Sequence, residues 1–371
     1  MQLIAYILLV KAMRFFKITE IKKVILLSFF AVSACTLILI FPDEASAGAK
    51  NGLEFCAGVL VPSLFPFMVI SSFTIESGLC SLLEKPFSKI IRHLFNLPGI
   101  CTSTIIMSLV GGYPVGARGI RGLYEKGLIT EKEAKQMAYF CVCSGPGFLI
   151  TFVGASLYHN KNIGIILLCS SVISVLILGI TIGLFNKNKI DTNNIIYSKP
   201  KLSDFSQSLA KSATDASRGV IEMCALVVFF SVFIKFGEMV ITNQNFLKGF
   251  YILTEVTTAS NNLSLNTPIY IIAFALGFGG LCVHFQVFQG LKDIKINKLL
   301  FFIFRIIQGI LTALFTNILL HFFPVSEQVF STAEKTNAVI SSSSYLGSIM
   351  LVITAVCFIY SIKSNNKKLG G

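Results

Sequence analysis

Residues 101–127 read CTSTIIMSLVGGYPVGARGIRGLYEKG, an apolar stretch that is interrupted in its middle. The interruption, Gly111-Gly112-Tyr113-Pro114, combines paired glycines with a proline, and both residue types break a helix. Backbone groups freed by such a break are tolerated inside a membrane only where protein or a water-filled cavity satisfies them. We therefore expect residues 98–124 to form two short half-helices that turn back as a re-entrant hairpin.

A second interrupted stretch occupies residues 246–265 and reads FLKGFYILTEVTTASNNLSL. Its apolar character is lost in the polar run from Thr257 to Asn262. We place the break in this run and expect a second re-entrant hairpin of the same kind.

Most of the remaining chain is apolar and uninterrupted. Of its 371 residues 54% are hydrophobic and only 13% are charged, whereas a soluble domain carries about 25% charged residues. A helix needs roughly 20 apolar residues to cross the hydrocarbon core. The predicted spans lie at about 24–41, 52–75, 136–158, 163–185, 216–240, 267–289, 299–321 and 345–362. The sequence thus predicts an all-α polytopic membrane protein with about eight transmembrane helices and two re-entrant hairpins.

The first span is followed by Ala45-Ser46-Ala47, which resembles the small-residue site of a cleaved signal peptide. A long basic preamble precedes this span, and further spans follow it. Both features favour a retained membrane helix over a leader that is removed.

The basic residues lie almost entirely on one side of this topology. With a cytoplasmic N-terminus, most of the 31 Lys and Arg residues fall on the inside. The outside segments hold only Lys50, Lys161, Lys248 and Lys335. This asymmetry follows the positive-inside rule and places both termini in the cytoplasm. The net charge of +13 is therefore a topology signal, and it requires no nucleic-acid partner.

Two cations, Lys235 and Arg305, fall inside predicted spans. Lys235 lies three residues before Glu238, so a local ion pair is expected. Arg305 is expected to reach the inner surface.

The first hairpin would enter from the cytoplasm and the second from outside. Residues 52–185 and 216–321 then each run span, hairpin, broken span, span, in opposite orientations. Transporters built as inverted repeats of this kind bind their solute near the midplane, where the breaks meet. The predicted divisions are 1–47 (basic N-terminus and first helix), 48–190 (repeat 1), 191–210 (cytoplasmic linker), 211–322 (inverted repeat 2) and 323–371 (outer loop, last helix and basic tail).

Two spans carry internal breaks, one from Cys143 to Phe148 and one from Gly277 to Gln286. A single break could reflect only close helix packing or a kink, but four breaks at corresponding places favour a binding site. Half-helix N-termini at Gly145–Phe148 and Gly279–Leu281 would offer N–H groups to a carboxylate or phosphate. The expected substrate-binding residues are Tyr113, Arg118, Ser144, Gly145, Gly147, Glu255, Thr258, Asn261, Asn262, Gly279, Gly280, His284 and Gln286, with Ser260 as a further polar contact.

Three ionisable residues of this set have alternative roles. Arg118 could pair with an anionic solute or extend to the cytoplasmic surface beside Arg121. Glu255 could bind a coupling H⁺ or Na⁺, or the solute itself. His284 could contact the solute or only pack between helices.

No cofactor, metal site or enzymatic activity is expected. The ten cysteines form no C-x-x-C pair, and neither H-E-x-x-H nor G-x-S-x-G occurs in the sequence. The expected partners are a small-molecule solute and membrane lipid. Homo-oligomerisation is left open, with a trimer suggested only by analogy with nucleoside transporters.

Five segments together resemble a known family. They are Pro62–Phe67, Gly112–Arg118, Leu123–Gly127, Ser144–Pro146 and Gly277–Gln286. In this order and spacing they resemble the sporulation integral membrane proteins of the YlbJ (SpoVV) type, which carry the nucleoside-recognition Gate domain. The resemblance extends over most of the chain from about residue 50 to residue 360.

This resemblance implies a fold related to concentrative nucleoside transporters and a location in the outer forespore membrane. It also implies passage of dipicolinic acid, a small aromatic dicarboxylate, during spore formation. The residues Cys141-Val142-Cys143 depart from the polar residues that often precede Ser-Gly-Pro in the family, which leaves the substrate open.

The leading hypothesis is a transporter for a small anionic solute, with dipicolinate first. The alternatives are nucleoside or nucleobase transport by the same fold and a non-transporting scaffold or assembly factor of the spore envelope. A scaffold would need an extramembrane domain, and the loops 186–215 and 322–344 are too short and polar to form one.

Overall fold

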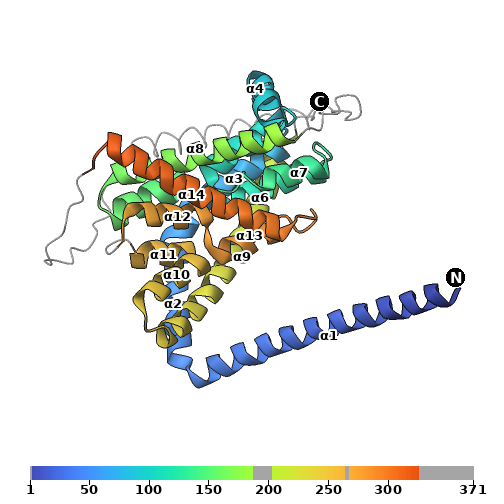
Figure 1. The fold of residues 1–371 in the computed structure, drawn as a ribbon. Helices are drawn as coiled ribbons and strands as arrows, with labels where there is room; N and C mark the ends of the chain where they lie inside the picture. The colour runs from blue at the N-terminus through green and yellow to red at the C-terminus, as the bar shows by residue number, and fades with distance from the viewer. Residues whose placement is uncertain (1, 187–202, 264–266, 326–371) are drawn as a thin grey trace, which may run out of the picture.

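The computed structural model describes residues 2–186, 203–263 and 267–325, and these ranges contain helices and no strand (Figure 1). The first half comprises α1 (Gln2–Ile40), α2 (Pro42–Phe55), the π-helix η1 (Cys56–Leu60), α3 (Val61–Glu76), α4 (Cys80–Phe95), α5 (Cys101–Gly111), α6 (Tyr113–Glu125), α7 (Glu131–Ala138), the π-helix η2 (Gly147–Leu157) and α8 (Lys161–Phe185). The second half comprises α9 (Phe205–Val240), α10 (Gln244–Thr254), α11 (Val256–Leu263), α12 (Ile269–Phe278), α13 (Gly280–Gly290) and α14 (Lys298–Phe322).

Among the described residues, six segments are long and apolar enough to cross a membrane. They are Ile21–Ile40, Pro42–Glu76, Lys161–Phe185, Phe205–Val240, Ile269–Gly290 and Lys298–Phe322. Each overlaps a span predicted from the sequence. The last predicted span, 345–362, lies outside the described residues.

The predicted span 136–158 is not one helix. The short helix α7 ends at Ala138, and the chain is then irregular from Tyr139 to Gly145. Only η2, of 11 residues, continues the apolar stretch as a helix. The prediction of a break in this region was right, but the break is longer than expected and begins earlier.

At the first predicted hairpin the chain forms two short helices, α5 and α6, that pack against each other. Gly112 joins them with a φ of +85°, in the left-handed region that favours glycine. A Cβ atom at Gly119 of α6 would lie 2.8 Å from Thr104 of α5. The backbone of α6 at Gly119 therefore packs closely against the Thr104 side chain of α5.

The second hairpin, α10 and α11, breaks at Glu255 and not in the run from Thr257 to Asn262, which is helical. Glu255 is extended, with φ −149° and ψ 125°. Its carboxylate accepts hydrogen bonds from the backbone N–H groups of Thr257 (2.8 Å) and Thr258 (2.6 Å). Because Glu255 satisfies the free N–H groups of the next helix, the polar run that follows can remain helical.

The two halves repeat one order of elements. A long helical segment, a pair of short helices, a broken helix and a 25-residue helix occur as α2–η1–α3, α5/α6, α7–η2 and α8, and again as α9, α10/α11, α12/α13 and α14, with α4 as an additional helix in the first half. Each 25-residue helix packs on the broken helix of its own half, α8 on η2 and α14 on α12. The helices α8 and α14 also pack on each other and run in opposite directions (Figure 1).

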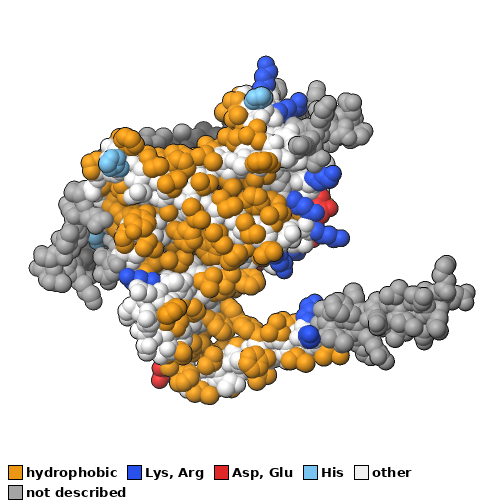
Figure 2. All heavy atoms as spheres, viewed as in Figure 1, with side chains coloured by type: hydrophobic (Ala, Val, Ile, Leu, Met, Phe, Trp, Pro, Cys, Tyr) orange, Lys and Arg blue, Asp and Glu red, His pale blue; other side chains and the backbone are white. Residues whose placement is uncertain are grey.

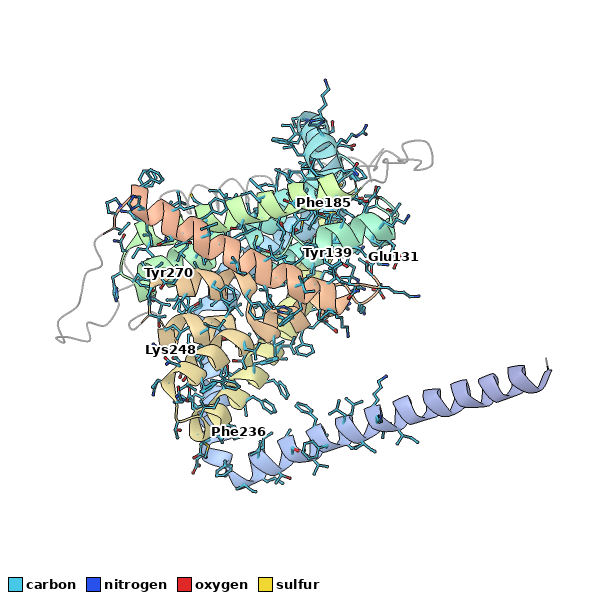
Figure 3. All side chains as sticks on the ribbon, viewed as in Figure 1. Glu131, Tyr139, Phe185, Phe236, Lys248 and Tyr270 are labelled. Atoms are coloured by element: carbon cyan, nitrogen blue, oxygen red, sulfur yellow. The ribbon has the colours of Figure 1, made fainter. Side chains whose placement is uncertain are left out.

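Charged side chains gather at one end of the bundle (Figure 2). Figure 3 places Glu131 and Phe185 toward this end and Lys248 and Tyr270 toward the opposite one. Lys248, which was predicted to lie outside, is therefore at the end opposite to Glu131 and Phe185.

The residues Ala45-Ser46-Ala47 lie inside α2, which packs along α9. A Cβ atom at Gly48 would lie 2.7 Å from the Cα atom of Val232, and one at Gly52 the same distance from the Cα atom of Val228. Residues four apart share one helix face. Glycine at both positions therefore lets the two backbones approach closely.

We predict that Gly52→Ala destabilises the protein by about 1–3 kcal/mol, because the added methyl group overlaps the α9 backbone. The thermal unfolding midpoint in detergent measures this. Gly58→Ala is the matched control, since a Cβ atom at Gly58 meets nothing within 4 Å. Equal midpoints for the two variants would contradict the close α2–α9 approach.

Candidate functional site

The four helix breaks meet in pairs. A Cβ atom at Gly112 would lie 3.0 Å from the backbone nitrogen of Gly145. In the second half, a Cβ atom at Gly280 would lie 3.0 Å from the carbonyl oxygen of Thr254 and 3.1 Å from the backbone nitrogen of Glu255. In each half, then, the hairpin break touches the break of the neighbouring helix.

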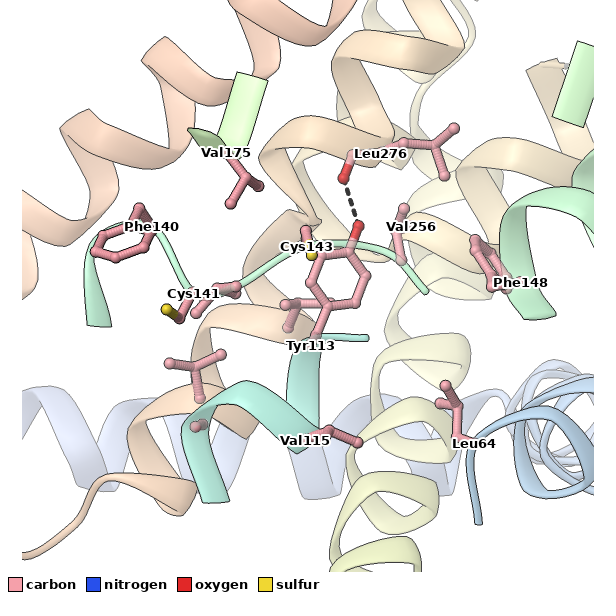
Figure 4. Packing of buried hydrophobic residues seen from close by; sticks show 14 of the residues in the cluster. Leu64, Tyr113, Val115, Phe140, Cys141, Cys143, Phe148, Val175, Val256 and Leu276 are labelled. Carbon is pink, nitrogen blue, oxygen red and sulfur yellow. Dashed lines mark hydrogen bonds between the residues drawn. The ribbon is translucent and has the colours of Figure 1, made fainter. Parts of the chain in front are cut away.

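Tyr113 joins the two halves at this crossing. Its buried hydroxyl group donates a hydrogen bond to the carbonyl oxygen of Leu276, near the end of α12 (Figure 4). The same hydroxyl group hydrogen-bonds the side chain of Ser144. One side chain at the start of α6 thus links both broken helices.

Arg305 of α14 satisfies the carbonyl groups that the breaks leave free. Its Nε atom donates to the carbonyl oxygen of Phe278 at 3.1 Å, and its terminal nitrogens donate to the carbonyl oxygens of Gly277 and Val142. It also donates to the side-chain oxygen of Gln308 at 2.6 Å. The planar guanidinium has five donors, which suits several carbonyl groups at one place.

The expectation that Arg305 reaches the inner surface was wrong, because its side chain is fully buried. The last carbonyls of α12 have no helical partner beyond Gly279, whose φ is +86°. A cation at a helix C-terminus is also favoured by the helix dipole.

The sequence did contain a signal for this role. One face of α14 carries a polar stripe with helical spacing within an apolar helix. The stripe consists of Arg305, Gln308, Thr312 and Thr316, all buried.

The breaks surround a cavity of about 30 Å³. Its polar lining residues are Tyr113, Glu255, Thr257 and Gln286, and its apolar lining includes Leu64. A water molecule needs roughly 10–15 Å³ of such volume. The cavity therefore has room for about two waters and is closed to a larger solute in this conformation.

Three helices begin at the cavity or directly beside it and have no side-chain cap. They are α6, η2 and α13, whose first residues are Tyr113, Gly147 and Gly280. A helix N-terminus carries a partial positive charge and favours an anion. The fourth N-terminus, that of α11, is already satisfied by the Glu255 carboxylate.

The predicted site residues fall into three groups. Tyr113, Gly145, Glu255 and Gln286 line the cavity. Ser144 and Gly280 lie directly behind it, against Tyr113 and Glu255 respectively. The residues that do not line the cavity in this conformation are Arg118, Gly147, Thr258, Asn261, Asn262, Gly279 and His284. Thr257 lines the cavity and was not predicted.

His284 lies in an aromatic cluster. Its Nδ1 atom donates to the carbonyl oxygen of Gly280 at 2.6 Å. The ring centroid lies 4.9 Å from that of Phe278, 5.2 Å from Phe301 and 5.5 Å from Phe302. Of its two predicted roles, the described contacts match packing between helices.

Arg118 forms an ion pair with α9. Its Nη2 atom lies 2.9 Å from Oε2 of Glu222, and Nη1 donates to the carbonyl oxygen of Asp215 at 2.8 Å. The guanidinium lies against the backbone of α9 at Gly219. Arg118 is therefore engaged by α9 rather than free to meet a solute in this conformation.

Two further cavities lie in a row between the central cavity and the charged end. A small cavity of about 20 Å³ shares Pro114, Met223 and Gln286 with the central one. It shares Arg118 and Glu222 with a third cavity of about 240 Å³. The third cavity has a charged lining that includes Glu76, Arg121, Asp215, Arg218 and Lys292. The Arg118–Glu222 ion pair stands between this charged cavity and the centre.

The predicted pair between Lys235 and Glu238 is present at 2.7 Å. Glu238 also accepts a hydrogen bond from the Tyr251 hydroxyl group at 2.9 Å. In the part of the chain that the structure describes, no group of three or more His, Cys, Asp or Glu side chains could hold a metal ion.

Part of the chain matches a known family model. Residues 57–183, from η1 almost to the end of α8, match the Gate family model, which is described as nucleoside recognition. This segment contains the first hairpin and the first pair of breaks.

A particular relative extends the similarity over both halves. The chain is similar to the sporulation integral membrane protein YlbJ of Bacillus subtilis (strain 168), at 24% identity over 81% of this chain and 84% of the relative. No solved structure matches the chain. The resemblance predicted from the sequence is thus confirmed: residues 57–183 match the Gate model, most of the chain is similar to a sporulation integral membrane protein, and the described residues hold six segments that could cross a membrane.

We predict that Arg305→Met is strongly destabilising, because hydrogen bonds to a charged group contribute about 1.5–3 kcal/mol each. Several buried carbonyl oxygens would lose their donor at once. The thermal unfolding midpoint in detergent should fall well below that of Arg121→Met, which removes a partly exposed guanidinium from surface ion pairs. Similar midpoints for the two variants would show that Arg305 does not hold the crossing together.

Proposed function

We propose that the protein is an alternating-access transporter for a small anionic solute, with dipicolinate as the first candidate. The observation that carries this proposal is a closed cavity at the crossing of four helix breaks, with uncapped helix N-termini around it. Discontinuous helices that meet in this way are typical of solute sites in membrane transporters.

The positive charge of Arg305 behind the cavity favours an anion. The hydrogen-bond partners of Arg305 among the described residues are carbonyl and amide oxygens, and no carboxylate contacts it there. Its positive charge is therefore not neutralised locally. Its guanidinium carbon lies 5.7 Å from the ring centroid of Tyr113, which separates it from the cavity. In such a low-dielectric region, charges interact far more strongly than in water.

Glu255 brings a negative charge to the same cavity and supports coupling to a cation. A carboxylate that is 1% exposed and lines the cavity would repel an anionic solute. Binding of H⁺ or Na⁺ at Glu255 would remove this repulsion and favour solute binding. We therefore propose cation-coupled transport, with Glu255 as the coupling residue.

Solute binding requires a larger cavity than the one described. A pyridine dicarboxylate is much larger than the two waters for which the cavity has room. We infer that the described conformation is occluded. The chain of cavities through Arg118 and Glu222 is the proposed route to the charged, cytoplasmic side.

Nucleoside or nucleobase transport is the second candidate. The match to a family described as nucleoside recognition favours it. The uncharged polar groups of Tyr113, Thr257 and Gln286 could hydrogen-bond a sugar or a base. The dipicolinate proposal and a location in the outer forespore membrane rest on the family resemblance.

The decisive experiment is uptake into proteoliposomes of labelled dipicolinate, with uridine and adenosine in parallel. We expect saturable dipicolinate uptake, and an apparent affinity about tenfold weaker in Gln286→Leu, since a hydrogen bond to a charged solute contributes about 1.5–3 kcal/mol. Gln207→Leu is the matched control, because Gln207 is exposed and far from the cavity lining.

The three uptake measurements distinguish the transport hypotheses from the scaffold hypothesis. Uptake of a nucleoside alone would retain the transporter and replace its substrate. Absence of all three fluxes with correctly folded protein would reject both transport candidates and favour a scaffold or assembly factor.

We further predict that Glu222→Gln opens the route to the charged side. A cysteine at Gln286 should react several-fold faster with a membrane-impermeant thiol reagent when the Arg118 ion pair is removed. Labelling of the native cysteines, measured without this substitution, is subtracted. Glu238→Gln, which removes the Lys235 ion pair on the same helix, should leave the rate unchanged. Equal rates in both variants would place the closure elsewhere.

A further inference from the structure

The helix α4 stands out at the end of the molecule where basic residues gather (Figures 1 and 2). It runs across the direction of α8 (Figure 1). One side is anchored: Ile91 and Phe95 are buried, and the Phe95 ring stacks on Phe140 with centroids 5.5 Å apart. The Phe95 carbonyl oxygen also accepts a hydrogen bond from Gln136 of α7. The position of α4 is thus fixed by packing on one face only.

The second face of α4 is apolar and uncovered. Leu82, Pro86, Ile90 and Leu94 are spaced four residues apart and therefore lie in one row along the helix. All four side chains are exposed, with Leu82 at 55% and Ile90 at 49%. The neighbouring Phe87 widens this row.

The third face of α4 is basic. Lys89 and Arg92 are exposed and lie beside the apolar row, on the side away from Phe87, whereas the exposed His93 falls within the row between Leu82 and Pro86. Neither Lys89 nor Arg92 forms an ion pair within the described residues. Glu84, the only acidic residue of the helix, lies beside Gly99 on the anchored side.

These three faces match the surface of an anionic membrane. A helix with an apolar face and an adjacent basic face lies in the plane of the interface, with its cations among anionic headgroups. The helix α4 packs on α8, and the end of α8 also carries exposed apolar residues, Leu184 and Phe185. The surface beside α4 therefore has the character of a lipid-facing surface and not of an isolated patch for a protein partner.

We propose that α4 is an interfacial helix that binds the headgroups of anionic phospholipids through Lys89 and Arg92. The binding site is independent of the transported solute. Because Gly99 packs against Ser88 and Glu84, the bound lipid would hold the start of α5, and with it the first hairpin, at a fixed depth.

The test uses the full chain purified in detergent, with lipid binding followed by native mass spectrometry. Phosphatidylglycerol and phosphatidylcholine are compared as probes. The double variant Lys89→Gln/Arg92→Gln should bind phosphatidylglycerol about 30-fold more weakly than the parent, from the loss of two cations at the headgroup. Binding of phosphatidylcholine should not change.

Two controls keep the test specific. Lys132→Gln/Lys295→Gln removes the same charge from exposed positions outside α4 and should leave phosphatidylglycerol binding intact. Lys89→Arg/Arg92→Lys retains both charges and should also bind normally. Unchanged phosphatidylglycerol binding in the α4 double variant, or an equal loss in the Lys132/Lys295 variant, would overturn the proposal.

Discussion

The crossing of the broken helices depends on one buried guanidinium. A helix that ends inside a membrane leaves carbonyl groups without hydrogen-bond donors, because no bulk water is present there to donate to them. Arg305 satisfies Gly277 and Phe278 at the end of α12 and Val142 in the irregular segment before η2. Because these carbonyls belong to both halves, one side chain fixes how the halves meet. Tyr113, the cavity and the helix N-termini are arranged around that contact.

The same constraint shapes the chemistry of the centre. Arg305 introduces a positive charge behind Tyr113, whereas Glu255 introduces a negative charge on the opposite hairpin. The two charges do not form an ion pair with each other. The hydrogen-bond partners of both side chains are uncharged: main-chain groups for Glu255, and main-chain carbonyls together with the Gln308 side chain for Arg305. Under the transport function that we propose, each charge could therefore interact with an ion or a solute.

The positions of residues that interrupt a helix were predictable from the sequence, whereas hydrogen-bond partners far apart in the sequence were not. The breaks at Gly112 and Gly279 follow from glycine and proline chemistry that acts over a few residues. The second hairpin was misplaced because a polar run normally indicates a loop, whereas here Glu255 caps the run locally, through the backbone N–H groups two and three residues further on. Arg305 was misread because its depth alone allowed it to extend to the surface. The buried polar stripe on α14 that Arg305 shares with Gln308 is what distinguishes a buried Arg305 from one that extends to the surface.

The small size of the central cavity has a consequence for the membrane as an electrical insulator. Space for about two waters cannot hold a continuous file of water along which protons would pass. The Arg118–Glu222 pair and Met223 separate that space from the charged end. We expect this conformation to be a poor path for protons, so a membrane that contains it would keep its pH gradient.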